Sequence, residues 1–227
     1  MLGLRPGERA LVVAAHPDDE TLGMAGTIAA LTGYGVEVDV IAVACLSGPM
    51  YGGTSDADIR CTEFRDACAV LGASGTIGWV DDERAANPGA HLGALVAVIE
   101  ESLAASTPAA MFIPTGGHHQ DHRAVHHAGL AAVRPGHRAN RPLPRLILGF
   151  DGPEDRIWLS AGLDRPVAVD ITTTMTIKQK ALLCYPSQIR QDPHPRSVEK
   201  IQALDQAAGA ARGVQAAELF ALYRMEV

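Results

Sequence analysis

Residues 11–26 read LVVAAHPDDETLGMAG, a short apolar run that stops at a histidine, a proline and three acidic residues. The apolar residues Leu11–Ala15 predict a buried strand, and Thr21–Thr32 carries apolar residues at helical spacing. Between them, Pro17 favours a sharp turn and the start of a helix, because proline fits the first helical position. The stretch therefore predicts a strand, a polar turn and a helix in immediate succession.

The same alternation of apolar strands and helices continues outward from this stretch. Further strands are predicted at Val36–Ala44, Thr76–Val80, Ala109–Ile113, Leu146–Phe150 and Pro166–Val169, and further helices at Asp58–Leu71, Leu92–Leu103 and His122–Val133. Continuous apolar strands that alternate with helices indicate an α/β fold, with a mostly parallel sheet and helices on both faces. Beyond residue 170 the pattern is helical, at Thr172–Leu183, Pro195–Ala211 and Ala216–Tyr223.

The composition is that of an ordinary globular protein. A length of 227 residues favours a single domain that spans residues 1–227. We expect a C-terminal helical segment, at about 172–227, to pack on it. The formal net charge of −7 argues against a nucleic-acid partner. No apolar run is long enough for a signal or a membrane span, and none of the four cysteines forms a CxxC pair. We therefore expect a cytoplasmic protein.

The polar turn after the first strand has the residue types of a metal site. Imidazole and carboxylate are zinc ligands, and His16 and Asp19 are close enough in sequence to converge on one ion. Asp18 would then be a free carboxylate beside the metal, able to take a proton from a bound water. The simpler alternative is helix capping, since aspartates are favoured at helix N-termini.

A second cluster follows the strand at Ala109–Ile113, where residues 114–123 read PTGGHHQDHR. Five histidines fall within ten residues there, and ligands of parallel sheets bind at the carboxyl ends of strands. Two half-sites after two strands predict three ligands and an open position, the pattern of catalytic zinc. The spacing leaves open which of His119, His122 and His126 is the ligand.

Four strings resemble one enzyme family, the PIG-L/LmbE-like zinc-dependent N-deacetylases. They are AHPDDE at 15–20 with Leu22-Gly23 and Gly26 after it, His119-Gln120-Asp121-His122, Arg60-Cys61-Thr62-Glu63, and Lys180, Leu183 and Ser187-Gln188. The second string departs from the usual His-Pro-Asp-His, because Gln120 stands in the place of proline. The resemblance spans roughly residues 10–190 and implies a Rossmann-like fold.

The resemblance also implies roles for the clustered residues. His16, Asp19 and His122 would be the zinc ligands, and Asp18 would be the general base. His119 would stabilise the oxyanion or protonate the leaving amine. The implied reaction is the removal of an acetyl group from an N-acetylglucosaminyl-type substrate, such as a glycoconjugate or an antibiotic intermediate.

Three further residues take supporting roles by the same resemblance. Asp121 would orient a histidine from outside the zinc ligands, and Arg60 would contact the substrate. Some relatives carry a tyrosine just before the second motif, where this chain has Gly116-Gly117-His118. His118 is the candidate to replace that tyrosine in contacting the substrate.

Other functions fit the sequence less well. A nicotinamide-dependent oxidoreductase would need a glycine-rich turn after the first strand, where this chain has His16-Pro17-Asp18-Asp19. A non-catalytic metal-binding module and a zinc amidase that acts on a non-acetyl amide remain alternatives. The expected partner is a small N-acetyl sugar or glycoconjugate, and self-association is a further expectation because homo-oligomers are common.

Overall fold

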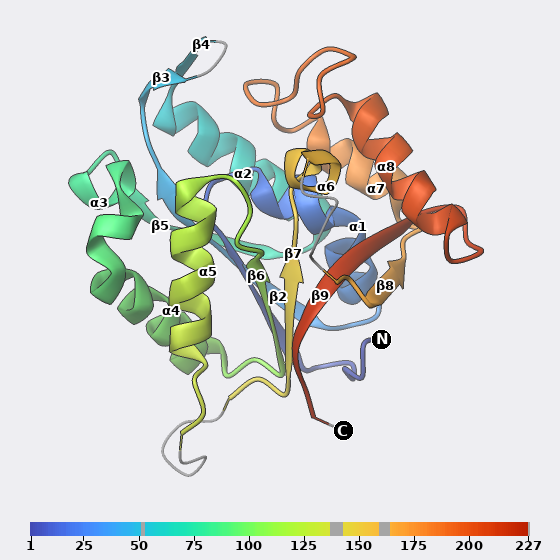
Figure 1. The fold of residues 1–227 in the computed structure, drawn as a ribbon, viewed down its shortest axis with the longest axis horizontal. Coiled ribbons are helices and arrows are strands. Elements are labelled where there is room, and N and C mark those ends of the chain that lie inside the picture. Colours follow the sequence, from blue (N-terminus) through green and yellow to red (C-terminus); the bar gives the residue numbers. More distant parts are fainter. Residues whose placement is uncertain (51–52, 137–142, 159–163, 227) are drawn as a thin grey trace.

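A mixed sheet runs through the computed structural model, which describes residues 1–50, 53–136, 143–158 and 164–226 (Figure 1). Within these residues the sheet has seven strands in the order β5-β2-β1-β6-β7-β9-β8. Their bounds are β5 Ser74–Val80, β2 Glu37–Cys45, β1 Arg9–Ala14, β6 Ala110–Pro114, β7 Leu146–Phe150, β9 Ala217–Met225 and β8 Val167–Asp170. The first five are parallel, whereas β9 is antiparallel to both of its neighbours.

Helices cover both faces of this sheet. They are α1 Asp19–Gly33, α2 Ala57–Leu71, α3 Glu83–Ala86, α4 Leu92–Ser106, α5 Gln120–Ala132, α6 Pro153–Trp158, α7 Met175–Leu182 and α8 Val198–Ala210, with a 3-10 turn η1 at Pro88–His91. A short hairpin of β3 Gly48–Met50 and β4 Gly53–Ser55 stands apart from the sheet (Figure 1). No helix in the described ranges is both long and apolar enough to cross a bilayer.

Two apolar cores lie on opposite sides of the sheet, because successive residues of a strand point to opposite faces. Val12 of β1 packs in the core shared with α1 and α2, and Val13 packs in the core shared with α4 and α5. The layers confirm the expected α/β class with a mostly parallel sheet.

The C-terminal prediction is wrong in one element. Ala216–Tyr223 was expected to be helical, whereas the chain forms β9 there, between β7 and β8. Alanine, glutamate and leucine are good helix formers, but intrinsic helix propensity is small in energy, and pairing with two strands outweighs it. The segment 172–227 is therefore helical only in α7 and α8, and its last strand completes the sheet.

The sheet order places the two predicted half-sites next to each other. β1 and β6 are parallel neighbours, with Val12 paired to Phe112. The loops that leave their carboxyl ends, 15–18 and 115–119, therefore begin side by side. The loop after β7 adjoins them in turn, because β7 pairs with β6.

Candidate metal centre and active site

The loop after β1 turns back on itself through Asp19. The Asp19 carboxylate accepts a hydrogen bond from the His16 backbone N–H at 2.8 Å, which closes the turn. The same oxygen lies 3.6 Å from His16 Nδ1, while His16 Nε2 lies 2.9 Å from Asp121 Oδ2 on the second loop. His16 is thus held between carboxylates of both loops.

Asp18 does not cap the helix that follows it. Its side chain makes no capping hydrogen bond and its backbone has φ 113°, a left-handed value that disfavours any residue but glycine. The carboxylate is 2% exposed, accepts a hydrogen bond from Arg196 Nη1 at 3.1 Å and lies 3.7 Å from Arg60 Nη2. The strained backbone and the buried, cation-flanked carboxylate are typical of a functional position.

A group of buried side chains holds this strained loop. Arg60 Nη2 donates to the Pro17 carbonyl at 2.8 Å, and the Asp18 N–H donates to Glu20 at 3.2 Å. Tyr185 donates in turn to the Glu20 carboxylate at 2.7 Å. Burial raises the pKa of Glu20 to about 7, against the hydrogen bonds from Thr21 and Tyr185. The loop is therefore fixed from α2 and from the segment after α7.

The Arg60–Glu63 string and the Ser187-Gln188 string contact each other next to this loop. Glu63 accepts from the Ser187 backbone N–H at 2.9 Å and from the Ser187 hydroxyl at 2.5 Å. Glu63 follows Arg60 by one helical turn, so one face of α2 binds both the loop and the Ser187 segment. By contrast, Lys180 and Leu183 are exposed, and the buried lysine of α7 is Lys178.

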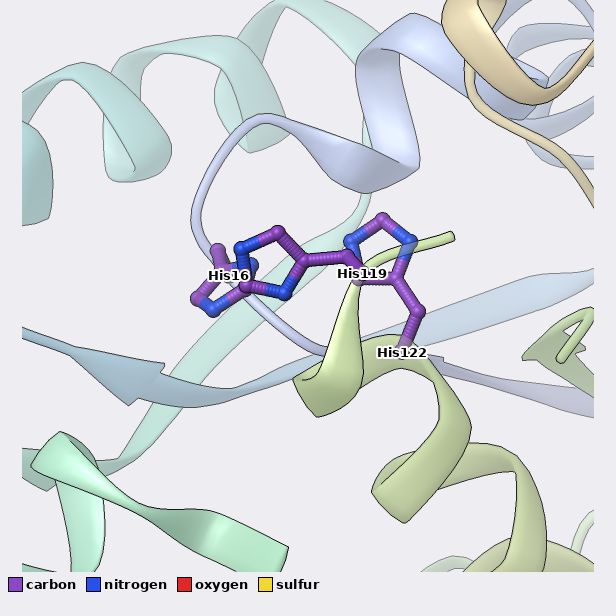
Figure 2. A group of neighbouring side chains, drawn as sticks. All are labelled: His16, His119 and His122. Atoms are coloured by element: carbon purple, nitrogen blue, oxygen red, sulfur yellow. The ribbon is translucent and has the colours of Figure 1, made fainter. Parts of the chain in front are cut away.

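The second loop brings two more imidazoles to His16. His119 is the N-cap of α5, and His122 lies in the first turn of that helix. Figure 2 shows the three rings facing a common space, with ring centroids 5.0 to 5.6 Å apart. One nitrogen from each of the three lies within 4.8 Å of the others, which is a donor set suited to a divalent cation.

The geometry supports two overlapping ligand sets. His16 and His122 belong to both, and the third donor is either His119 or the Asp19 carboxylate, which lies 3.2 Å from His122 Nε2. Asp19 is buried between the two shared histidines, whereas the His119 side chain is 46% exposed. The His119 Nδ1 also accepts the Asp121 N–H at 3.2 Å, which leaves Nε2 to carry a proton.

Asp155 lies behind His122 and was missed by the sequence analysis. Its Oδ2 is 3.9 Å from His122 Nδ1, and its Oδ1 accepts from the His118 N–H at 3.0 Å. The carboxylate occupies the space where a side chain at Gly117 would begin, since a Cβ there would lie 2.0 Å from Oδ2. Asp155 follows the carboxyl end of β7, so the rule that ligands gather at strand ends could have found it.

The remaining histidines of the cluster point elsewhere. His118 lies 2.7 Å from Asp155 through Nδ1 and stacks on the exposed Trp158, with ring centroids 4.3 Å apart. It is absent from the lining of the adjacent cavity, so its position does not favour the expected substrate contact. His126 Nδ1 lies 3.0 Å from the Pro114 carbonyl, outside the group of three imidazoles, which removes it from the ligand candidates.

The carboxylates set the protonation of the centre. Burial opposes the charged form of His122, but Asp19 and Asp155 outweigh it and raise the pKa of His122 to about 10. Burial likewise opposes ionisation of Asp155, but the neighbouring His122 and the hydrogen bonds from His118 lower its pKa to about 2. For Asp18, burial raises the pKa and the arginines oppose it. The neighbouring carboxylates therefore favour positive charge at His122.

A cavity of about 540 Å³ opens beside His16 and His119. Asp121 and Arg60 also line it, and the predicted contact of Arg60 with the substrate stays a prediction. Its other walls come from the β3–β4 hairpin and from the segment 190–196. The donor group therefore faces a space large enough for a sugar-sized ligand.

Comparison with known proteins places the chain in a family. The profile of the PIG-L family, described as GlcNAc-PI de-N-acetylase, matches residues 11–133. An Escherichia coli (strain K12) protein called uncharacterized deacetylase YaiS is 30% identical over 158 residues, which cover 66% of this chain and 76% of that protein. Both half-sites fall inside the residues matched by the family profile.

Solved structures share the fold at lower identity. N,N'-diacetylchitobiose deacetylase from Pyrococcus horikoshii superposes with a TM-score of 0.71 at 23% identity, over 95% of this chain and 84% of that one. GalB, the 4-carboxy-2-hydroxymuconate hydratase from Pseudomonas putida KT2440, superposes with a TM-score of 0.71 at 21% identity, over 97% and 98%. The profile covers more than half of the chain, with both histidine motifs inside the match, so this chain belongs to the PIG-L deacetylase family.

Proposed function

We propose that this chain is a zinc-dependent N-deacetylase that removes acetate from an N-acetylated amino sugar. The observation that carries the proposal is the convergence of His16 and His122 from two separate loops, with Asp19 between them and the uncapped Asp18 beside them. Imidazole nitrogens with one carboxylate are the donors of catalytic zinc sites. The relative that acts on diacetylchitobiose supports an acetamido sugar as the substrate class.

The metal would be held by His16, Asp19 and His122, which leaves His119 as a hydrogen-bond donor beside them. A divalent cation bound there would polarise the acetyl carbonyl and lower the pKa of a coordinated water. Asp18 takes the proton from the attacking water, because its carboxylate is held by Arg196 and makes no capping hydrogen bond to the helix. The water oxygen forms a new C–O bond at the acetyl carbon. The C–N bond then breaks while the amine nitrogen receives the proton that Asp18 had taken, and acetate and the free amine leave.

His119 is placed to serve the oxyanion or the leaving amine. Its Nδ1 accepts the Asp121 N–H, so its Nε2–H is the donor at the cavity. Burial and the neighbouring histidine charges lower the pKa of His119, which favours the neutral ring with one N–H. A donor aimed at developing charge can lower the barrier by about 3 to 4 kcal/mol.

Substrate panels test the reaction class. GalB shares the fold and carries a hydratase name, so the fold alone does not choose between hydration and amide hydrolysis. We expect the zinc-loaded protein to release acetate and amine in equal amounts from N-acetylglucosamine or N,N'-diacetylchitobiose. N-formyl and N-propionyl analogues separate a deacetylase from a broader amidase. Zinc-loaded protein that releases no amine from any acetamido sugar would contradict the proposal.

Substitution of Asp18 tests the general base. Asp18→Asn removes the proton acceptor while leaving the size of the side chain, so turnover should fall at least about a hundredfold. Zinc content, measured by mass spectrometry of the metal, should stay near that of the wild type, because Asp18 is not a ligand. Asp66→Asn on the exposed side of α2 is the matched control and should keep full activity. Wild-type turnover in Asp18→Asn would refute the assignment.

A further inference from the structure

The acidic groups that line the cavity already have partners. Glu154 accepts from Arg196 Nε at 2.5 Å, and Asp121 Oδ2 lies 2.9 Å from His16 Nε2. Arg196 is occupied in the same way, since its Nη1 donates to Asp18 at 3.1 Å. Among the described residues that line the cavity, these pairs therefore leave no unpaired carboxylate.

Arg190 also lines this cavity, but it donates to backbone carbonyls rather than to carboxylates. Its Nη1 donates to the Ser187 carbonyl at 2.8 Å and to the Ile189 carbonyl at 3.2 Å. Within the described residues its side-chain contacts are to these carbonyls and to no carboxylate, and its Nε and Nη2 are not among the buried atoms without a partner. The two carbonyls fix one end of the guanidinium, and the edge formed by Nε and Nη2 stays accessible. That edge is the one that binds carboxylate and phosphate in two parallel hydrogen bonds.

Other donors of the cavity wall also lack acceptors. Ser55 and Arg60 are each 8% exposed and line the cavity, and within the described ranges Ser55 Oγ and Arg60 Nε have no hydrogen-bond partner. His194 accepts the Arg196 N–H through Nδ1 at 3.0 Å, so its Nε2 carries the proton. The wall therefore offers more donors than acceptors, and buried polar groups of this kind normally have a partner.

We propose that this cavity binds an anionic group, a phosphate or a carboxylate, on the amine-bearing part of the substrate, with Arg190 as its anchor. The proposal rests on the proposed function only in that the ligand is the substrate. An acetyl group beside the histidines would fill a small part of about 540 Å³, which leaves room for the amine-bearing part in the cavity that Arg190 also lines. The whole chain has a net charge of −7, so the attraction must come from this local wall.

Binding of product analogues tests the anchor without depending on turnover. The ligands are methyl glucosaminide, glucosamine 1-phosphate and carboxymethyl glucosaminide, which contain no acetamide. Calorimetry with the zinc-loaded protein should give a Kd for at least one anion roughly ten to a hundred times lower than for the methyl compound. The anion with the lower Kd identifies the group. Arg190→Gln should abolish this preference, and Arg212→Gln, at an exposed position, should keep it.

Each outcome decides the proposal. Equal affinity for neutral and anionic ligands, or no binding of any, overturns it. A preference for anions that survives in Arg190→Gln also overturns it, because the metal rather than Arg190 would then bind the anion. Amine release from the acetylated counterparts is measured separately, so a failure of deacetylation is distinguishable from a failure of the anion site.

Discussion

Asp155 shows how a single carboxylate controls the metal-binding histidine beside it. It is buried, it accepts hydrogen bonds from His118, and it lies on the side of His122 that faces away from Asp19. A carboxylate in that position orients an imidazole and makes it a stronger ligand. Asp155→Asn should therefore weaken zinc binding about ten- to a hundredfold, measured by competition with a chelator of known affinity.

A second substitution separates this positioning from a general loss of fold. Gly117→Ala keeps Asp155 in the sequence but places a Cβ 2.0 Å from its carboxylate, so the carboxylate must move away from the loop. Zinc affinity should fall as it does in Asp155→Asn. Gly93→Ala on α4, where a Cβ meets no atom within 4 Å, is the control and should bind zinc normally. Normal zinc affinity in both Asp155→Asn and Gly117→Ala would show that the carboxylate does not orient His122.

At the scale of the element, α1 is two helical pieces joined at Met24, whose φ of −151° is not helical. The break frees the N–H groups of Gly26 and Thr27, and Glu218 of β9 accepts both, at 3.0 and 2.7 Å. The same carboxylate accepts from Lys178 of α7 at 2.7 Å. Glu218 therefore ties the first helix of the chain to its last strand.

Removal of this buried carboxylate should be costly. Glu218→Ala removes one carboxylate partner of Lys178 and leaves the N–H groups of Gly26 and Thr27 without an acceptor. The free energy of unfolding should therefore fall by about 3 to 5 kcal/mol. Glu37→Ala removes one side of the exposed pair between Arg9 and Glu37 and should cost less than about 1 kcal/mol. Urea unfolding of the two variants measures the difference, and equal losses would show that the Glu218 contacts contribute little.

Local pattern predicted the elements that pack through their own periodicity and failed where tertiary pairing decides. The strands at 11–15 and 146–150 and the four main helices are confirmed within a few residues, because each buries an apolar face that the sequence displays. β9 was taken for a helix, because its strand character comes from β7 and β8 rather than from its own residues. The short α6 carries no long periodicity and was not predicted.

Some features of the candidate site could likewise be predicted from the sequence, and others depend on tertiary structure. Convergence of His16 and His122 follows from parallel strands that end at one edge, so the sequence was sufficient to predict it. Asp155 follows a third strand end, so the strand-end rule could have pointed to its segment, but that segment has no motif and no spacing rule pairs Asp155 with His122. The orientation of His118 depends on Asp155 and Trp158, so its turn away from the cavity was not predictable either.

At the scale of the whole molecule, a bound cation joins loops from different parts of the chain. His16 follows β1 and His122 follows β6, while the C-terminal β9 lies in the same sheet. We propose that residues 1–227 unfold as one domain. A ligand that binds only the folded site should therefore raise the temperature of a single unfolding transition. Zinc at about a thousand times its Kd adds about 4 kcal/mol, which for a domain of this size raises Tm by about 8 to 16 °C.

The size of that zinc effect should depend on pH in a fixed direction. In the metal-free protein the pKa of His122 is raised to about 10, so protonated His122 stabilises the fold fully below its unfolded pKa of about 6.5 and progressively less as pH rises toward 10. Zinc needs the neutral imidazole and must displace this proton. The rise in Tm caused by zinc should therefore be larger at pH 8 than at pH 6, by scanning calorimetry of zinc-loaded and chelator-treated protein. His122→Ala should lose both the rise and its pH dependence, and a rise in Tm that is equal at the two pH values would mean that the metal displaces no proton from His122.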